Sequence, residues 1–228
     1  METIVITGAN RGIGLELTKQ FLHLGWHVIA TCRDKSKADQ LNMLTSRGKL
    51  STHFLELTNE SDVVEFCTAL SGVTVDVLIN NAGVLGGDNQ SANNMDYNEW
   101  LKTFAVNTLA PFHLATSLKG NLQQSSRPRI VSISSGMASL SGQSIGTYAY
   151  RSSKAALNKV MQVLANEYKQ DGIIVCPVNP GWVRTDMGGK GADISVEESA
   201  AGLVGLINGL TLDHSGRFLS WDGEELSW

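Results

Sequence analysis

The sequence predicts a doubly wound α/β fold, a three-layer sandwich in which helices cover both faces of a parallel sheet of about seven strands. Short β-branched or apolar runs alternate along the chain with longer segments of helical periodicity. These runs are apolar on both faces, as strands buried inside a parallel sheet are. A chain of 228 residues is ordinary for one such fold, so we expect a single domain over residues 1–228.

The expected elements follow one another in a regular order. The first half predicts a strand at 4–7, a helix at 14–24, a strand at 28–32, a helical stretch, a strand at 51–57 and a helix at 61–70. The second half predicts a strand at 75–80, a long helix at 97–118, a strand at 129–134, a helix at 150–168, a strand at 173–178, a last helix and a strand at 217–220.

Two loops rich in Gly, Asn and Asp interrupt this order, at 83–94 and 188–193. The second is followed by Ser195 and Glu198, the spacing of a capping box that starts a helix. We interpret this second loop as a lid.

Composition excludes several function classes. The net charge of −4, with scattered Lys and Arg, predicts no binding of nucleic acid or of an anionic membrane. The 3 cysteines and 5 histidines have no metal-ligand spacing, so we expect no metal site and no disulfide framework. A strand-like run at 3–6 leaves no room for a secretion signal and no long apolar stretch occurs, so we expect a cytoplasmic protein.

A glycine-rich segment lies between the first strand and the first helix. It reads Thr-Gly-Ala-Asn-Arg-Gly-Ile-Gly over residues 7–14. Glycines allow a tight turn and a close approach to a pyrophosphate, and the positive end of the following helix attracts its negative charge. This context predicts a Rossmann-type dinucleotide site with GxxxGxG spacing.

A tyrosine and a lysine form a second candidate site. Tyr150 and Lys154 are four residues apart, so they share one face of the predicted helix. A neighbouring ammonium favours the phenolate and would lower the pKa of the tyrosine, which allows the pair to move a proton. Upstream, Ser134 or Ser135 ends a strand at the sheet edge where ligands bind, and its hydroxyl could donate to a substrate carbonyl.

With these motifs the chain resembles the short-chain dehydrogenase/reductase family over essentially its full length. The motifs that carry the resemblance are TGANRGIG (7–14), NNAG (80–83), the Asn of FAVNTLAPF (107), ISSG (133–136), YRSSK (150–154) and NPGWVRT (179–185). YAYRSSKAALN and the ending SWDGEELSW are most similar to the carbonyl-reductase-like branch that includes the sniffer and C-factor proteins.

The resemblance implies roles for four residues. Tyr150 would be the general acid and base, and Lys154 would lower its pKa and hold the nicotinamide ribose. Ser135, favoured over Ser134, would polarise the substrate carbonyl, although 15 positions separate it from Tyr150, slightly more than is usual in the family. Asn107 would hold a water that links Lys154 to solvent.

The resemblance also implies a cofactor site. Besides Tyr150 and Lys154, the residues expected to contact the cofactor are Gly8, Asn10, Arg11, Gly12, Ile13, Gly14, Arg33, Leu57, Asn80, Ala82, Gly83, Pro180, Gly181, Val183 and Thr185. Where the family often has Asp beside the adenine this chain has Glu56; its contact is left open, and the amide of Leu57 is preferred.

The cofactor is predicted to be NADP(H). An NAD site places an acid at the end of the second strand, where this chain has Cys32 followed by Arg33. Arg11 is a second cation in the glycine loop, and two guanidinium groups suit a 2′-phosphate. Asp34 is the competing candidate for a ribose acid, but it lies one residue farther on.

The expected activity is hydride transfer between NADP(H) and a small carbonyl or alcohol, with Met137, Trp182 and Met187 lining an apolar substrate pocket. The alternative is an NADP(H)-binding redox-sensing or signalling protein with little turnover. The helices at 97–118 and 150–168 carry apolar residues beyond the face that a sheet covers, and in the family this pair packs across a twofold axis. A homodimer is therefore predicted, with a tetramer as the alternative.

Overall fold

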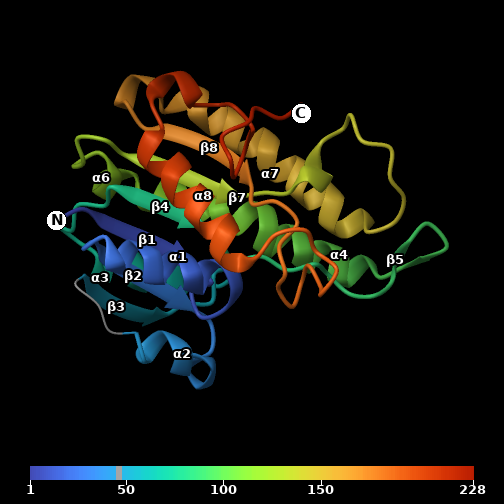
Figure 1. The fold of residues 1–228 in the computed structure, drawn as a ribbon, viewed down its shortest axis with the longest axis horizontal. Helices are drawn as coiled ribbons and strands as arrows, with labels where there is room; N and C mark the ends of the chain where they lie inside the picture. The colour runs from blue at the N-terminus through green and yellow to red at the C-terminus, as the bar shows by residue number, and fades with distance from the viewer. Residues whose placement is uncertain (45–47) are drawn as a thin grey trace.

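The computed structural model describes residues 1–44 and 48–228, which form a seven-stranded sheet covered by helices on both faces (Figure 1). All seven strands are parallel and lie in the order β3-β2-β1-β4-β7-β8-β9. Their bounds are β1 Thr3–Thr7, β2 His27–Cys32, β3 Lys49–Phe54, β4 Val77–Asn80, β7 Arg129–Ile133, β8 Ile174–Asn179 and β9 Leu219–Ser220. The predicted doubly wound fold is confirmed.

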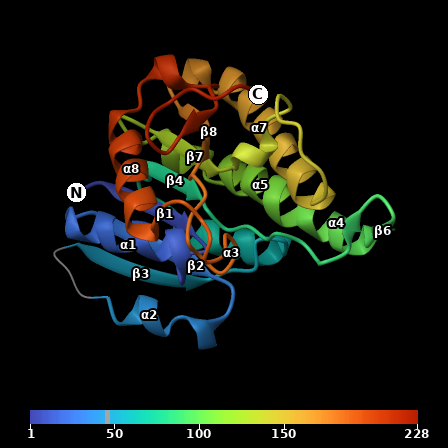
Figure 2. The ribbon, with the colours of Figure 1, turned by 45° about the vertical axis from the view of Figure 1, so that its right-hand side comes forward.

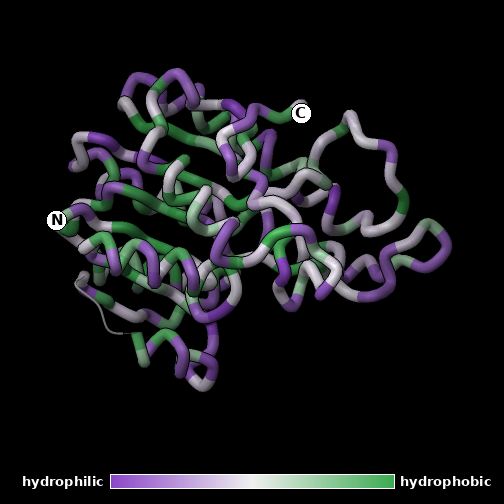
Figure 3. The backbone as a smooth tube through the Cα atoms, in the orientation of Figure 1, coloured by the Kyte–Doolittle hydropathy of each residue, from purple (hydrophilic) through white to green (hydrophobic). Residues whose placement is uncertain are grey.

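Helices cover the two faces in two layers (Figures 1 and 2). The helices are α1 Gly12–His23, α2 Asp39–Asn42, α3 Glu60–Ala69, α4 Tyr97–Phe104, α5 Ala110–Ser117, α6 Lys119–Leu122, α7 Tyr148–Glu167 and α8 Val196–Gly209. Side chains alternate along β1, so Ile4 and Ile6 join a core with α1 and α8, while Val5 joins a core with α3, α5 and α7. The central strands, such as β1 and β4, are largely hydrophobic along their length (Figure 3), as burial on both faces requires.

The chain is helical from Tyr97 to Ser117, as predicted, but this segment is not α-helical throughout. It consists of α4, a π-helical turn at Ala105–Leu109, and α5, which has Pro111 in its first turn. A π turn inserts one extra residue into a helix, and such turns occur frequently at functional sites. Asn107 is the middle residue of this one.

Other boundaries differ by a few residues. β3 was expected at 51–57 but spans Lys49–Phe54, because it pairs with β2 in a register that runs from His27↔Lys49 to Cys32↔Phe54. The loop expected at 83–94 contains a short antiparallel hairpin, β5 Gln90–Ser91 and β6 Asn94–Met95. Ser195 caps α8 as predicted, since its Oγ accepts a 3.1 Å hydrogen bond from the amide of Glu198.

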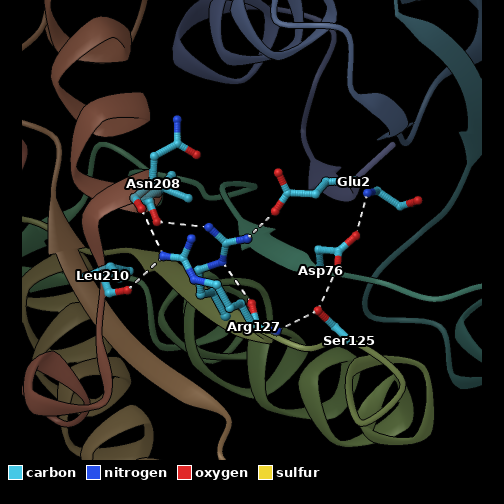
Figure 4. A network of polar contacts seen from close by, with 9 residues as sticks. Glu2, Asp76, Ser125, Arg127, Asn208 and Leu210 are labelled. Atoms are coloured by element: carbon cyan, nitrogen blue, oxygen red, sulfur yellow. Dashed lines mark hydrogen bonds and ion pairs between the residues drawn. The ribbon is translucent and has the colours of Figure 1, made fainter.

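An arginine is buried at the amino-terminal end of β7. Figure 4 shows a network of polar contacts that includes Glu2, Arg127, Asn208 and Leu210. Arg129, 1% exposed, donates hydrogen bonds to the Ile207 carbonyl (3.3 Å) and to Glu2 Oε1 (2.9 Å), and its guanidinium lies over the Trp26 ring. Arg127 donates to the carbonyls of Asn208 and Leu210. The two arginines therefore satisfy carbonyl groups at the carboxyl end of α8, which a helix leaves unpaired.

Candidate active site

The glycine loop turns from β1 into α1 with very little room. A Cβ on Gly14 would lie 2.3 Å from the Gly8 carbonyl oxygen and 2.4 Å from Asn81 Nδ2, so no larger residue fits there. Arg11 precedes α1, and its side chain does not cap the helix, so the first amides can bind an anion. Gly8 and Gly12 have positive φ, Ile13 packs on the core, and Asn10 donates to the Lys37 carbonyl.

Asn81 supports this loop, and the sequence analysis missed it. Its Nδ2 donates to the carbonyls of Thr7 (2.8 Å) and Gly8 (3.1 Å), and Thr7 Oγ1 accepts from the amides of Asn81 and Ala82. Asn80, which was expected at the cofactor, turns its buried side chain the other way, toward the Pro111 carbonyl and Ser132 Oγ. Both asparagines lie in the NNAG motif, so the signal for Asn81 was present in the sequence.

A cleft of about 690 Å³ opens beside the glycine loop. Its lining includes Arg11 and Arg33, the two predicted cations. Arg11 Nη1 lies 3.0 Å from Asp186 Oδ2, and Arg33 Nη1 lies 3.7 Å from Glu56 Oε2. Both arginines are exposed, so each can exchange its carboxylate for a phosphate. Leu57 is half-buried in the turn after β3, next to Glu56.

The two candidate serines occupy different environments. Ser134 is buried, and its Oγ donates to Asn158 Oδ1 inside the protein. Ser135 is half-buried; its Oγ accepts from the amide of Met137 and forms a hydrogen bond with Tyr150. Ser135 therefore contacts the candidate catalytic tyrosine, whereas Ser134 holds β7 against α7. Met137 follows in a short helix, Gly136–Ala138, beside the site.

The pKa of Tyr150 departs from the expectation drawn from its spacing to Lys154. Burial of the phenol raises its pKa above the ordinary value, while the hydrogen bond from Ser135 lowers it. The expected lowering by Lys154 was wrong for this structure, because the lysine Nζ lies 6.0 Å from the centre of the tyrosine ring and donates to the Ile133 carbonyl instead (2.7 Å). Tyr150 is therefore protonated at neutral pH.

Lys154 is buried between α7 and the end of β7. Burial lowers the pKa of its ammonium from 10.5 to about 8. A Cβ on Gly83 would lie 3.5 Å from Lys154 Nζ and 3.3 Å from Asn107 Oδ1. Gly83 also lines the cleft, so the lysine lies directly behind the cleft wall.

Asn107 holds this wall in place. It is completely buried; its Oδ1 accepts from the Val84 amide (2.9 Å), and its Nδ2 donates to the Val84 carbonyl (2.9 Å) and to Ser153 Oγ (3.0 Å). Ser153 in turn donates to the Tyr150 carbonyl. Asn107 thus joins the cleft wall to α7, and its predicted contact with a water remains a prediction.

The segment after β8 closes over the glycine loop. Pro180 accepts a hydrogen bond from Ser199, Val183 pairs with Ile194, and a Cβ on Gly12 would lie 3.4 Å from Thr185. Gly181 has a positive φ beneath Ile194. Two apolar side chains on this segment remain exposed: Trp182, whose Nε1 donates to the Gly188 carbonyl, and Met187, which lines the cleft.

Within residues 1–44 and 48–228, no helix has the length and apolar character needed to cross a bilayer. Across the same residues, no group of three or more His, Cys, Asp or Glu side chains is placed to hold a metal ion.

The sequence matches a known protein family and curated relatives. The family model described as "short chain dehydrogenase" matches residues 2–193. A curated relative, "C-signal" from Myxococcus xanthus, is 38% identical over 169 residues, which are 72% of this chain and 98% of that protein.

Solved structures agree with the family match over the full chain. The carbonyl reductase Sniffer of D. melanogaster superposes with a TM-score of 0.94 at 32% identity, covering 100% of both chains. The NADPH-bound carbonyl reductase from chicken fatty liver superposes with a TM-score of 0.92 at 32% identity, covering 100% of this chain and 99% of that one.

Proposed function

The chain belongs to the short-chain dehydrogenase family, and from that premise we propose that it transfers hydride between NADP(H) and a carbonyl or alcohol substrate. The observation that carries the proposal is the contact between Ser135 and Tyr150 at the carboxyl end of β7, with buried Lys154 one helical turn away. A proton donor, a hydrogen-bond donor and a cation meet there at the edge of the sheet where α/β folds bind ligands.

The chain's own residues fit the dinucleotide. The cradle made by Gly8, Gly14 and Asn81 admits only backbone, and the uncapped start of α1 suits a pyrophosphate. Arg11 and Arg33 would hold the 2′-phosphate, and Gly83 with the 180–185 segment would flank the rest of the cofactor. When bound, NADPH supplies the hydride that reaches the carbonyl carbon.

Tyr150 completes the reduction by giving its proton to the substrate oxygen. Because burial raises its pKa, the phenol carries this proton at neutral pH. Ser135 would donate a hydrogen bond to the same oxygen, where negative charge develops. The Lys154 ammonium, which donates to the Ile133 carbonyl behind the cleft wall, would hold the nicotinamide ribose.

An alternative function is NADP(H)-dependent sensing or signalling with little turnover. The similarity to the protein named C-signal is the observation in its favour. Against it stands the complete set of Ser135, Tyr150 and Lys154, because a protein that only binds the cofactor needs no proton donor.

We propose that residues 1–228 form a single domain that acts in the cytoplasm on small carbonyl or alcohol compounds, as a homodimer or, alternatively, a tetramer. Exposed apolar side chains on α4, the π turn and α5 support self-association.

The test is a turnover screen of aldehydes and ketones with NADPH, followed by Tyr150→Phe. This substitution keeps the ring but removes the proton donor, so turnover should fall by about 10²–10⁴-fold while NADPH binding changes little. Tyr148→Phe is the matched control, since Tyr148 is exposed and has no lysine four residues on. Near-normal turnover of Tyr150→Phe contradicts the mechanism, and NADPH binding by a wild type that turns over no carbonyl favours the signalling alternative.

A further inference from the structure

We propose that Gln90, a residue of the β5–β6 hairpin, positions the catalytic tyrosine by holding the backbone of Tyr150 against the cleft wall. The inference rests on the proposed function of Tyr150 and adds a residue far from it in sequence. The hairpin lies beside α4, on the side of the molecule away from the amino terminus (Figures 1 and 2).

The Gln90 amide is buried and fully partnered. The residue is 8% exposed. Its Oε1 accepts a 3.1 Å hydrogen bond from the Tyr150 amide, and its Nε2 donates to the carbonyls of Leu85 and Gly87, both at 2.8 Å. The Gln90 side chain thus accepts one hydrogen bond from α7 and donates two hydrogen bonds to the loop after β4.

The start of α7 lacks a cap of its own. Thr147 precedes the helix in the left-handed region, with φ of 49°, and makes no side-chain cap bond. Among the described residues it is the only non-glycine with positive φ. Tyr150 is the third residue of α7, and amides in the first turn of a helix have no partner within the helix. Gln90 supplies the partner for this one from 60 positions away.

The loop after β4 is built around the Gln90 amide. A Cβ on Gly86, where φ is +90°, would lie 2.9 Å from both Gln90 Nε2 and Thr103 Oγ1, so glycine lets the loop wrap closely around the amide. Val84, Leu85 and Gly86 line the cleft. Gln90 therefore links the cleft wall directly to the turn of helix that carries Tyr150.

Two connections now fix Tyr150 relative to the cleft. Asn107 joins Val84 to Ser153, and Gln90 joins Leu85 and Gly87 to Tyr150 itself. A proton donor must lie within hydrogen-bond reach of the reacting oxygen, so a small displacement of this turn lowers the rate. Gln90 acts through Tyr150 and is a positioning residue.

Gln90→Met keeps the length of the side chain and removes all three hydrogen bonds. We expect kcat to fall by about 10–100-fold while the affinity for NADPH is retained, because misplacement of a catalytic group lowers the rate by up to this order. Hydrogen exchange at the Tyr150 amide should become faster than in the wild type.

Gln90→Glu supplies a readout that a purely structural role would not move. The ionised carboxylate can still accept from Tyr150, but its second oxygen faces the carbonyls of Leu85 and Gly87 with no hydrogen to donate. Burial and these carbonyls raise the pKa of the introduced carboxyl, and its protonated form restores one donor. Turnover of Gln90→Glu should therefore recover toward wild type as pH falls and decline as pH rises through that pKa.

Asn121→Asp is the matched control. Asn121 Nδ2 also donates to two loop carbonyls, those of Leu70 and Val73. These residues precede β4, at the end of that strand opposite to the cleft. Its pH profile of turnover should follow that of the wild type. A Gln90→Glu profile parallel to the wild type, or a Gln90→Met variant with wild-type kcat, overturns the role of Gln90. If the wild type itself turns over no carbonyl, the proposed function fails, and unchanged exchange at Tyr150 in Gln90→Met then decides against Gln90 independently.

Discussion

Arg33 and Arg11 reach the cleft already paired with carboxylates, and these pairs determine how a phosphate would be bound. Each arginine is exposed, and the Arg33–Glu56 contact is long at 3.7 Å, so giving up the acid costs little. A 2′-phosphate offers charge-assisted hydrogen bonds in exchange. In the proposed cofactor site, the arginines would select the phosphate by replacing a weak partner with a stronger one.

Arg33→Ala should weaken NADPH binding by about 1.5–3 kcal/mol, the range for a hydrogen bond to a charged group, and barely change NADH. The measurement is kcat/KM for both cofactors in wild type and variant. Lys37→Ala removes a neighbouring cation that is paired with Asp34 and should leave the cofactor ratio unchanged. A wild-type preference for NADH, or equal losses for both cofactors in Arg33→Ala, contradicts the assignment.

Lys154 predicts a dependence of stability on pH. Its pKa falls from 10.5 to about 8 on folding, so between these values the unfolded chain binds a proton that the folded chain has released. The cost of burying the charge is fully present below pH 8 and is relieved as pH rises to 10.5. This corresponds to about 3 kcal/mol.

Lys154→Met removes the titrating group and should abolish this gain. As pH rises from 8 to 10.5, the wild type should therefore gain about 3 kcal/mol of unfolding free energy relative to the variant. Urea denaturation at several pH values measures it. A difference that stays constant from neutral pH to pH 10.5 would show that the lysine is not buried as a cation.

The sequence predicted the candidate site residues but not their environments. The spacing of Tyr150 and Lys154 predicted a shared helix face, and α7 has it. Spacing alone cannot reveal that burial raises the pKa of Tyr150, because burial depends on elements distant in the chain. Spacing also cannot distinguish Ser134 from Ser135. The two serines differ only in their neighbours, which are Asn158 for Ser134 and Tyr150 for Ser135.

At the scale of elements, periodicity predicted the strands and helices, whereas tertiary contacts determined where they end. α7 begins at Tyr148, two residues before the expected start, with its first turn held by Gln90. The π turn at Ala105–Leu109 does not visibly disturb the apolar periodicity of the residues around it. The sequence pattern therefore predicts one helix there. The hairpin at 90–95 is too short, at two residues a strand, to be recognised by alternation.

Arg129 gives an element-scale prediction, because it connects β7, the amino terminus and the carboxyl end of α8. Arg129→Met should lower the unfolding free energy by about 2–4 kcal/mol, since it leaves the buried Ile207 carbonyl without its donor. Arg127→Met, at an exposed position on the same network, should cost less than about 1 kcal/mol. Equal losses in urea denaturation of the two variants would contradict the importance of burial.

At the scale of the whole molecule, exposed apolar side chains gather on the helices that flank the site. Leu101, Leu109 and Phe112 are exposed on α4, the π turn and α5, and Val163 is exposed on α7. Sedimentation at micromolar concentration should show a species larger than the 24.5 kDa chain. Leu109→Glu should shift it toward the monomer, while Leu212→Glu, at an exposed leucine on the short helix Leu212–His214, should not. A wild-type protein that sediments only as a monomer would contradict self-association.

The packing of α1 against α8 has a consequence for how the chain folds during synthesis. α1 is made first, yet its buried residues Leu17 and Phe21 share a core with Leu203 and Ile207 of the last helix. A nascent chain that has not reached residue 196 lacks α8, so it exposes the α1 side chains that α8 covers until that helix has left the ribosome. Contacts between such distant residues form slowly and leave intermediates prone to aggregation. The native packing of α1 is therefore complete only after α8 has docked.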